Sequence, residues 1–164
     1  MADKAGIFLT PESAAILKKL GDKDLIRLKE AFRGIGKDFR QYMKLYFSTP
    51  GTARFDDLKE ATKKAKARLY GTVYPILTAS GDMAASFYDK AHSQNISLIG
   101  NTAAEFGSSS GIAQYHQYGT KNMSRRRILI SDDRRDLRWK RIMNNYLIKL
   151  LKANGINTQE GIWQ

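Results

Sequence analysis

The feature that most constrains the fold of this chain is a long run of apolar residues at helical spacing. Successive members lie alternately three and four residues apart, over about six helical turns. They are Leu25, Leu28, Phe32, Ile35, Phe39, Tyr42 and Tyr46. Side chains at this spacing share one face of a helix, so the sequence predicts a long helix with one buried side. Gly34 and Gly36 weaken it and indicate a bend or a close contact with neighbouring backbone.

Capping and helix-breaking residues predict where the neighbouring helices begin and end. Residues 10–12, Thr-Pro-Glu, have the chemistry of a helix start, and Gly21 would close this short first helix. The sequence STPGT, residues 48–52, ends the long helix because proline and glycine interrupt its pattern. A third helix is expected over residues 57–70, where the Lys and Ala content indicates a largely solvent-facing element.

The middle of the chain changes from helical to alternating patterns. Residues 83–88 alternate as a half-buried strand does. Residues 95–107, NISLIGNTAAEFG, predict its partner strand, joined to it by a polar turn at residues 92–95, so we expect an antiparallel hairpin. Residues 126–131, RRILIS, are a further strand candidate. Residues 112–120 fit either a short helix or an irregular segment.

A last helix is expected to close the fold. Ser131, Asp132 and Asp133 are typical of a helix start. The apolar stripe of this helix comprises Trp139, Ile142, Met143, Tyr146, Leu147 and Leu150. Together the elements predict an α+β fold with long N-terminal helices, a small antiparallel β-sheet and a closing C-terminal helix. We expect a single domain over residues 1–164, made of a short helical arm (1–21), a core (22–153) and a C-terminal tail (154–164).

The positive charge of the chain is concentrated in one segment. The formal net charge of the chain is +12. Residues 121–152 contain eleven Lys or Arg and three Asp, a net charge of +8, so the rest of the chain carries only +4. Such a segment attracts polyanions, and the sequence favours nucleic acid and an acidic protein surface equally. The candidates for contact with DNA or an acidic partner are Lys121, Arg134, Arg135, Arg138 and Arg141, besides the three arginines at 125–127.

No motif in the sequence supports an enzyme. The chain has no cysteine, which excludes disulfides, thiolate metal sites and a nucleophilic thiol. His92 and His116 lack the spacing of a metal site, and neither a nucleophile elbow nor a phosphate-binding glycine motif is present. We therefore expect no catalytic residue, metal or cofactor. No stretch approaches the roughly 20 apolar residues of a membrane span, and we expect no membrane partner.

Residues 115–131, YHQYGTKNMSRRRILIS, combine aromatic residues, a glycine turn and three arginines. This stretch belongs to a series of four blocks that resembles the phage virion morphogenesis family, the tail-completion proteins of contractile-tailed phages. The blocks are LKEATKKAKARLYGTVYPILTASGDMAAS, Gly100 followed by YHQYGT, MSRRRILIS, and DDRRDLRWKRIMNNYLIKLL, within about residues 25–152. Arg126 aligns with an arginine of the family, whereas Ser124 and Arg127 stand where the family usually has prolines.

The resemblance implies a structural virion protein of the phage neck, similar to tail terminators and head-to-tail joining proteins. It would complete the tail tube and join tail to head as part of a ring, commonly hexameric, around the DNA path. Its partners would be copies of itself, tail tube and sheath proteins, head connector or stopper proteins, and genomic DNA in the lumen. The protein would assemble in the host bacterial cytoplasm and reside in the virion. Neither enzymatic activity nor a cofactor accompanies the resemblance.

Within this interpretation, residues 115–127 supply the subunit or partner interface. Its expected members are Tyr115, His116, Gln117, Tyr118, Arg125, Arg126 and Arg127. Alternation along a strand would direct Arg125 and Arg127 to one side and Arg126 to the other. The alternative function is a basic nucleic-acid-binding module that uses residues 121–141.

Overall fold

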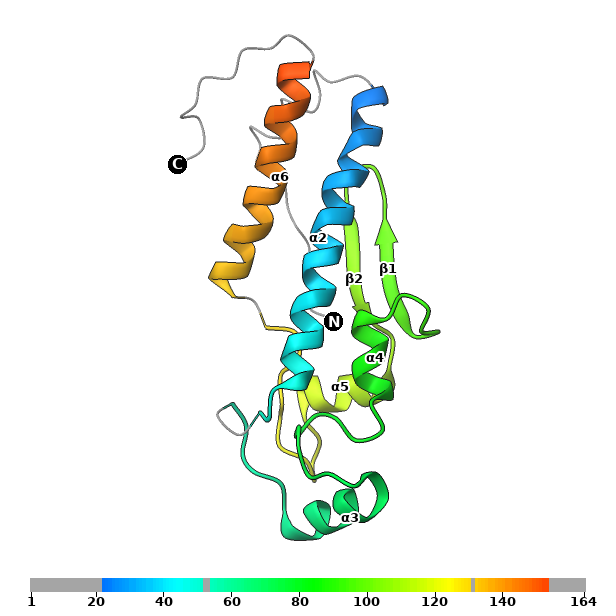
Figure 1. The fold of residues 1–164 in the computed structure, drawn as a ribbon, viewed down its shortest axis with the longest axis vertical. Helices are drawn as coiled ribbons and strands as arrows, with labels where there is room; N and C mark the ends of the chain where they lie inside the picture. Colours follow the sequence, from blue (N-terminus) through cyan, green and yellow to red (C-terminus); the bar gives the residue numbers. More distant parts are fainter. Residues whose placement is uncertain (1–21, 52–53, 131, 154–164) are drawn as a thin grey trace. The chain divides into compact units, whose positions relative to one another are not determined.

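The computed structural model describes residues 22–51, 54–130 and 132–153. Within them the chain forms five helices and one two-stranded antiparallel sheet, which confirms the α+β class (Figure 1). The elements are α2 (Asp22–Ser48), α3 (Glu60–Tyr70), α4 (Asp82–Tyr88), β1 (Asn95–Ile99), β2 (Ala104–Ser108), α5 (Gly111–Tyr118) and α6 (Asp133–Ala153). The expected N-terminal arm (1–21), the capping Ser131 and the C-terminal tail (154–164) lie outside the described residues.

The chain divides into two compact units that share two elements. The described part of the first unit comprises residues 22–36, 98–105 and 132–153, and that of the second comprises 37–51, 54–97 and 106–130. Helix α2 and the β1–β2 hairpin therefore contribute residues to both units. The expected single domain stays a prediction.

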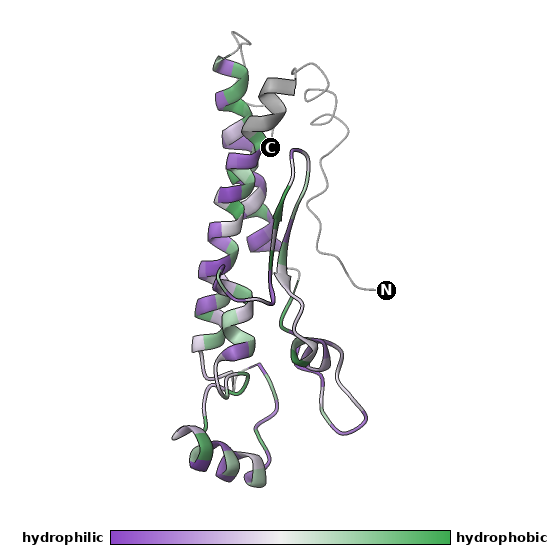
Figure 2. Cartoon of the chain, turned by 90° about the vertical axis from the view of Figure 1, so that its right-hand side faces the viewer, coloured by the Kyte–Doolittle hydropathy of each residue, from purple (hydrophilic) through white to green (hydrophobic). Residues whose placement is uncertain are grey.

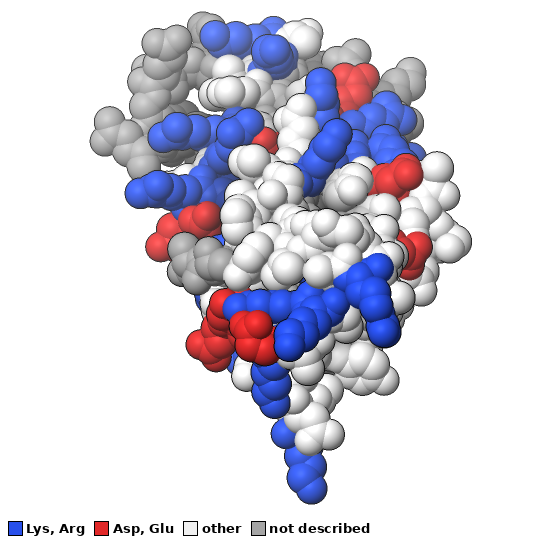
Figure 3. Space-filling view, turned by 60° about the horizontal axis from the view of Figure 1, so that its bottom comes forward, with Lys and Arg blue, Asp and Glu red and all other residues white. Residues whose placement is uncertain are grey.

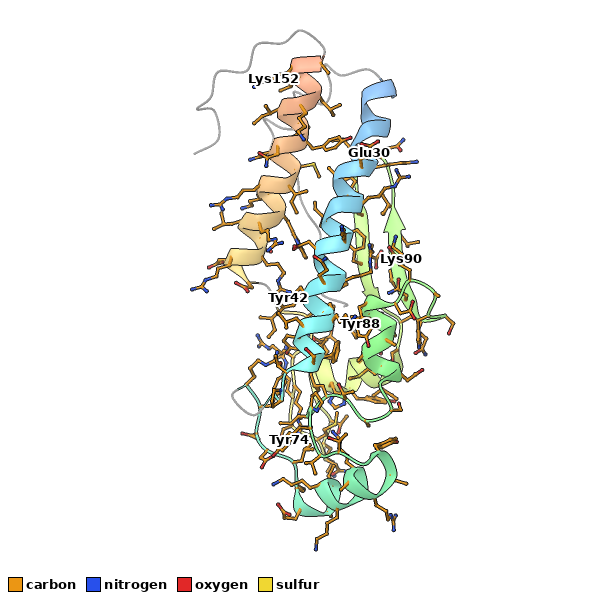
Figure 4. The ribbon with its side chains drawn as sticks, in the orientation of Figure 1. Glu30, Tyr42, Tyr74, Tyr88, Lys90 and Lys152 are labelled. Carbon is orange, nitrogen blue, oxygen red and sulfur yellow. The ribbon has the colours of Figure 1, made fainter. Side chains whose placement is uncertain are left out.

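The core of the first unit lies between α6 and the first part of α2, which run side by side (Figure 1). A Cβ at Gly34 would lie 3.4 Å from Cγ2 of Ile142, so this glycine does mark a close contact, with a side chain of α6. The Tyr146 hydroxyl donates a hydrogen bond to Glu30, which Figure 4 labels on α2. The buried apolar residues are Leu28, Ala31, Phe32 and Ile35 of α2 and Met143, Leu147, Leu150 and Leu151 of α6. The predicted stripes of both helices are thus confirmed where their side chains are described, and both helices carry mixed hydrophobic and hydrophilic residues (Figure 2).

The core of the second unit is aromatic. Phe47 of α2 packs against Phe87 of α4 with ring centroids 5.5 Å apart, and Phe39 stacks on Phe106 of β2 at 5.9 Å. Ile128, from the segment that follows α5, is 1% exposed. Aromatic pairs at such distances add roughly 0.5–1.5 kcal/mol each to the energy of area burial, so this cluster holds α4, β2 and the end of α2 together.

Helix α3 starts and ends close to its predicted bounds. Gly71 adopts the left-handed conformation (φ 70°) at its C-terminus, and its N–H donates to the Ala67 carbonyl at 3.0 Å. Lys63 Nζ and the hydroxyl of Tyr74, which lies near α3 in Figure 4, both bind the Asp57 carboxylate. These hydrogen bonds lower the pKa of Asp57 to about 2. The otherwise solvent-facing helix buries only Lys66 among its described residues, and Lys66 Nζ donates to the Pro75 carbonyl at 2.7 Å.

Three strand predictions are wrong. Residues 83–88 belong to helix α4, because Met83, Ala84, Ser86 and Phe87 are buried at positions i, i+1, i+3 and i+4, a helical rather than an alternating pattern. Residues 95–107 contain most of both strands of the hairpin and its turn, in which the Gly100 N–H donates to the Ala103 carbonyl at 2.8 Å. Residues 126–130 form no strand.

Candidate functional site

Helix α5 exposes an apolar stripe. It is the short helix that the sequence left open against an irregular segment. Ile112, Tyr115 and Tyr118 lie three residues apart and are 57%, 60% and 51% exposed, whereas Ala113 is buried. Residues three apart share a helix face. The stripe therefore places two tyrosines and an isoleucine together in solvent, and we call residues 111–130, which present and support it, the α5 elbow.

A glutamine side chain fastens the two arms of the α5 elbow to each other. Gln117 Oε1 accepts hydrogen bonds from the N–H groups of Ile128 at 2.8 Å and Leu129 at 3.0 Å, and its Nε2 donates to the Leu129 carbonyl at 3.0 Å. These are the bonds that a neighbouring strand would otherwise make with this backbone. The amide of Gln117 takes the place of such a strand, so this backbone bonds to a side chain and residues 126–130 form no part of a sheet.

The bend of the α5 elbow depends on Gly119. Its φ of 76° and ψ of 173° fall in a region that is essentially restricted to glycine, and a Cβ there would lie 3.2 Å from the Arg125 nitrogen and the Met123 oxygen. Beyond it, Thr120 and Met123 exchange two backbone hydrogen bonds of 3.0 and 3.2 Å around a tight turn. The glycine thus allows the chain to fold back against the end of α5.

Two arginines of the predicted interface bind the end of α5 as the chain returns. Arg125 Nε donates to the Gln117 carbonyl at 2.9 Å, and the Arg126 N–H donates to the His116 carbonyl at 2.8 Å. A guanidinium at a helix C-terminus also interacts favourably with the negative end of the helix dipole. Further along, the Tyr46 hydroxyl of α2 donates to the Arg127 carbonyl at 2.6 Å. The returning segment is therefore tied to both α5 and α2 within the second unit.

The predicted interface residues divide into an exposed and an enclosed group. Tyr115, Tyr118, Arg125 and Arg127 are exposed, whereas His116, Gln117 and Arg126 are half-buried. As expected, Arg126 differs from Arg125 and Arg127 in exposure. The strand that was expected to produce this difference is not formed by residues 126–130. The sequence prediction missed Ile112, although its position three residues before Tyr115 could have indicated that it shares a helix face with this tyrosine. It also missed the hydrogen bonds of Gln117, which no local sequence pattern indicates.

His116 and Arg126 bring two nitrogen-bearing groups together in the enclosed part of the α5 elbow. His116 Nδ1 and Arg126 Nε are buried and have no hydrogen-bond partner among the described residues. Burial, and secondly the charge of Arg126, lower the pKa of His116. Both effects favour the neutral form of the imidazole.

The remaining basic candidates belong to different units of the chain. Lys121 is exposed in the turn of the second unit, whereas the four arginines belong to α6 in the first. Arg134, Arg138 and Arg141 are exposed, but Arg135 is only 7% exposed, and its Nη2 lies 4.0 Å from the Asp132 carboxylate. Arg135 therefore cannot offer its charge to a partner as the sequence suggested. Figure 3 shows Lys and Arg side chains over much of the viewed face, with fewer acidic ones among them.

The described residues contain no group of three or more His, Cys, Asp or Glu side chains placed to hold a metal ion. Within the same residues no helix is both long and apolar enough to cross a bilayer. The α5 elbow itself combines aromatic, amide and guanidinium groups, which suit recognition of another macromolecule better than bond-making chemistry.

Comparisons of the chain with protein-family models, curated proteins and solved structures give no match. The resemblance to the phage virion morphogenesis family therefore stays a prediction.

Proposed function

We propose that this chain is a structural virion protein of the phage neck. In this proposal, copies of the chain form a ring, a hexamer by the resemblance, that completes the tail tube and joins it to the head around the DNA path. Tail tube and sheath proteins lie on one side, and head connector or stopper proteins on the other. The protein acts by assembly in the bacterial cytoplasm and in the virion, without catalysis, cofactor or membrane.

The observation that carries the proposal is the exposed stripe of Ile112, Tyr115 and Tyr118 beside Arg125 and Arg127. Tyrosine and arginine are enriched at protein interfaces and among the residues that dominate binding energy. A closed ring is built from heterologous contacts, in which each subunit uses two different patches. The α5 elbow supplies one of these two patches.

The internal hydrogen bonds of the α5 elbow also support this role. Gln117, the Gly119 bend and the Tyr46 hydroxyl hold the stripe in place in the isolated subunit. A surface that is ordered before binding loses less conformational entropy on association. Full burial of a large apolar side chain is worth about 1.5–3 kcal/mol. Each half-exposed tyrosine would therefore contribute about 1 kcal/mol to the binding free energy between two neighbouring subunits.

The test is a double substitution in the stripe. Tyr115→Ala with Tyr118→Ala should weaken each contact between neighbouring subunits by about 2 kcal/mol, or roughly 30-fold in affinity, because both tyrosine rings are removed from it. The matched control is Leu69→Ala with Tyr70→Ala, which removes two exposed apolar side chains from α3. Light scattering after size exclusion and negative-stain images of tails would measure ring formation and incorporation at one tail end.

The proposal predicts that the stripe variant stays folded but forms fewer rings and fewer joined particles, while the control behaves as the unmodified chain does. Equal ring formation and particle yield in the two variants would refute it. So would a chain that remains monomeric at high concentration and never enters tails.

A further inference from the structure

Helix α6 carries a continuous basic stripe on its exposed side. The stripe consists of Arg134, Arg138, Arg141, Lys149 and Lys152, with Asn145 between them. All six residues are exposed, and each lies three or four positions from the next, so they share one helix face. From Arg134 to Lys152 the stripe extends about 27 Å at 1.5 Å per residue. Lys152, labelled in Figure 4, marks its end in the last turn of α6.

The acidic residues of α6 lie away from this stripe. At about 100° per residue, Asp133 and Asp136 are roughly 100° and 160° around the axis from Arg134. Asp132, just before the helix, accepts the Arg134 N–H at 3.0 Å and lies near the buried Arg135, where it belongs to the helix start. No carboxylate of α6 therefore interrupts the row of cations.

Packing within the first unit fixes which face of α6 is exposed. The contact of Ile142 with Gly34 and the hydrogen bond of Tyr146 to Glu30 turn the apolar face toward α2. Met143, Leu147 and Leu150 are buried on that face. The helix cannot rotate about its axis without exposing this core, so the basic stripe is a permanent feature of the surface.

We propose that the basic stripe of α6 binds the phosphates of double-stranded DNA without regard to base sequence. Duplex DNA carries one negative charge per about 1.7 Å of its axis, so it offers phosphates along the full length of the stripe. Arginine and lysine both bind phosphate, and the centres of protein interfaces are depleted of charged residues. A row of five cations with a single amide fits a polyanion better than a protein seam.

This inference goes beyond the proposed function because it concerns a different surface from the α5 elbow. It can be tested on the soluble full-length chain, without tails or rings. A failure to form rings would not contradict DNA binding by α6, and a failure to bind DNA would not contradict the proposed interface at the α5 elbow.

The experiment measures affinity for short duplexes of two unrelated sequences by fluorescence anisotropy between 50 and 200 mM salt. Arg138 already has an interaction within the chain, so the expected contacts are those of Arg134, Arg141, Lys149 and Lys152. Each neutralised phosphate contributes about −0.9 to the slope of log K against log salt, so four contacts give about −3.6, or roughly a 150-fold loss of affinity over this range. The variant Arg134→Gln, Arg141→Gln, Lys149→Gln should reduce the slope to about −0.9, a loss of only about 3.5-fold.

The matched control removes the same charge from the second unit, with Lys59→Gln, Lys64→Gln and Arg68→Gln, all exposed positions at α3. It should keep the slope near −3.6. If the stripe variant proves unstable by circular dichroism, Lys149→Gln with Lys152→Gln in the last turns should reduce the slope to about −1.8. Equal slopes for stripe and control variants would overturn the proposal, as would absent binding at 50 mM salt. Polyglutamate that binds more tightly than the duplex would also overturn it and identify an acidic protein as the partner.

Discussion

The hydrogen bonds of Gln117 lead to the sharpest test of the α5 elbow. Replacing Gln117 with leucine keeps a side chain of similar size but removes one acceptor and one donor. Three hydrogen bonds are lost, to the N–H groups of Ile128 and Leu129 and to the Leu129 carbonyl. At about 1 kcal/mol for each bond, the free energy of unfolding should fall by about 3 kcal/mol.

Urea unfolding and amide exchange measure this loss independently. With a denaturant slope of about 2 kcal/mol per molar, the midpoint should fall by about 1.5 M. The amide protons of Ile128 and Leu129 should exchange about 100-fold faster, since 1.4 kcal/mol corresponds to a factor of ten. Gln114→Leu is the control, because Gln114 lies on the same helix but is exposed. If both substitutions had the same effect on stability and exchange, the fastening role assigned to Gln117 would be wrong.

Three further substitutions test other contacts of the second unit. Gly119→Ala introduces a Cβ 3.2 Å from backbone atoms at a φ of 76°, and urea unfolding should show a loss of at least about 2 kcal/mol. Tyr46→Phe removes the donor to the Arg127 carbonyl and should cost about 1 kcal/mol in the same titration. Burial and a neighbouring arginine lower the pKa of His116 in the folded state. The unfolded chain therefore protonates His116 more readily than the folded chain does, and stability falls as the pH drops below about 6.5. His116→Gln should flatten this fall in the thermal midpoint, and an unchanged fall in this variant would contradict the assignment.

Local patterns were sufficient for the long helices. The apolar spacing of α2 and α6 is a property of neighbouring residues, and most stripe positions are buried. They are Leu28, Phe32, Ile35, Phe39 and Tyr46 of α2 and Met143, Leu147 and Leu150 of α6. Helix α3 ends at Tyr70 as predicted, because the next residue, Gly71, adopts a left-handed conformation that favours glycine. Such signals can be read without knowledge of the partner segment.

The β predictions failed because short apolar segments fit two periods. In residues 83–88, alanine and serine fill both faces, so an alternating pattern was assigned to a helix whose burial follows positions i, i+3 and i+4. The segment 126–130 has strand-like composition, but its hydrogen-bond partner is the side chain of Gln117, up to twelve residues away. No local pattern could have indicated that a side chain would take the place of a strand.

Exposure of the candidate residues could be predicted from the sequence only in part. Tyr115 and Tyr118 are exposed, as an interface requires, whereas the enclosure of His116 depends on the return of residues 124–130. For the basic residues the missing information was helix phase. Arg134 and Arg135 are adjacent in sequence, yet 100° of rotation places the first in solvent and the second among buried side chains.

The hydrogen bonding of residues 126–129 also limits how another molecule can engage this part of the protein. The N–H of Arg126, the carbonyl of Arg127, the N–H of Ile128 and both polar groups of Leu129 already have partners within the subunit. Another polypeptide cannot bind here by strand addition, because these backbone groups are already hydrogen-bonded. In the proposed interface, recognition would therefore depend on side chains such as Tyr115, so surface substitutions could change the partner while the backbone beneath keeps its hydrogen bonds.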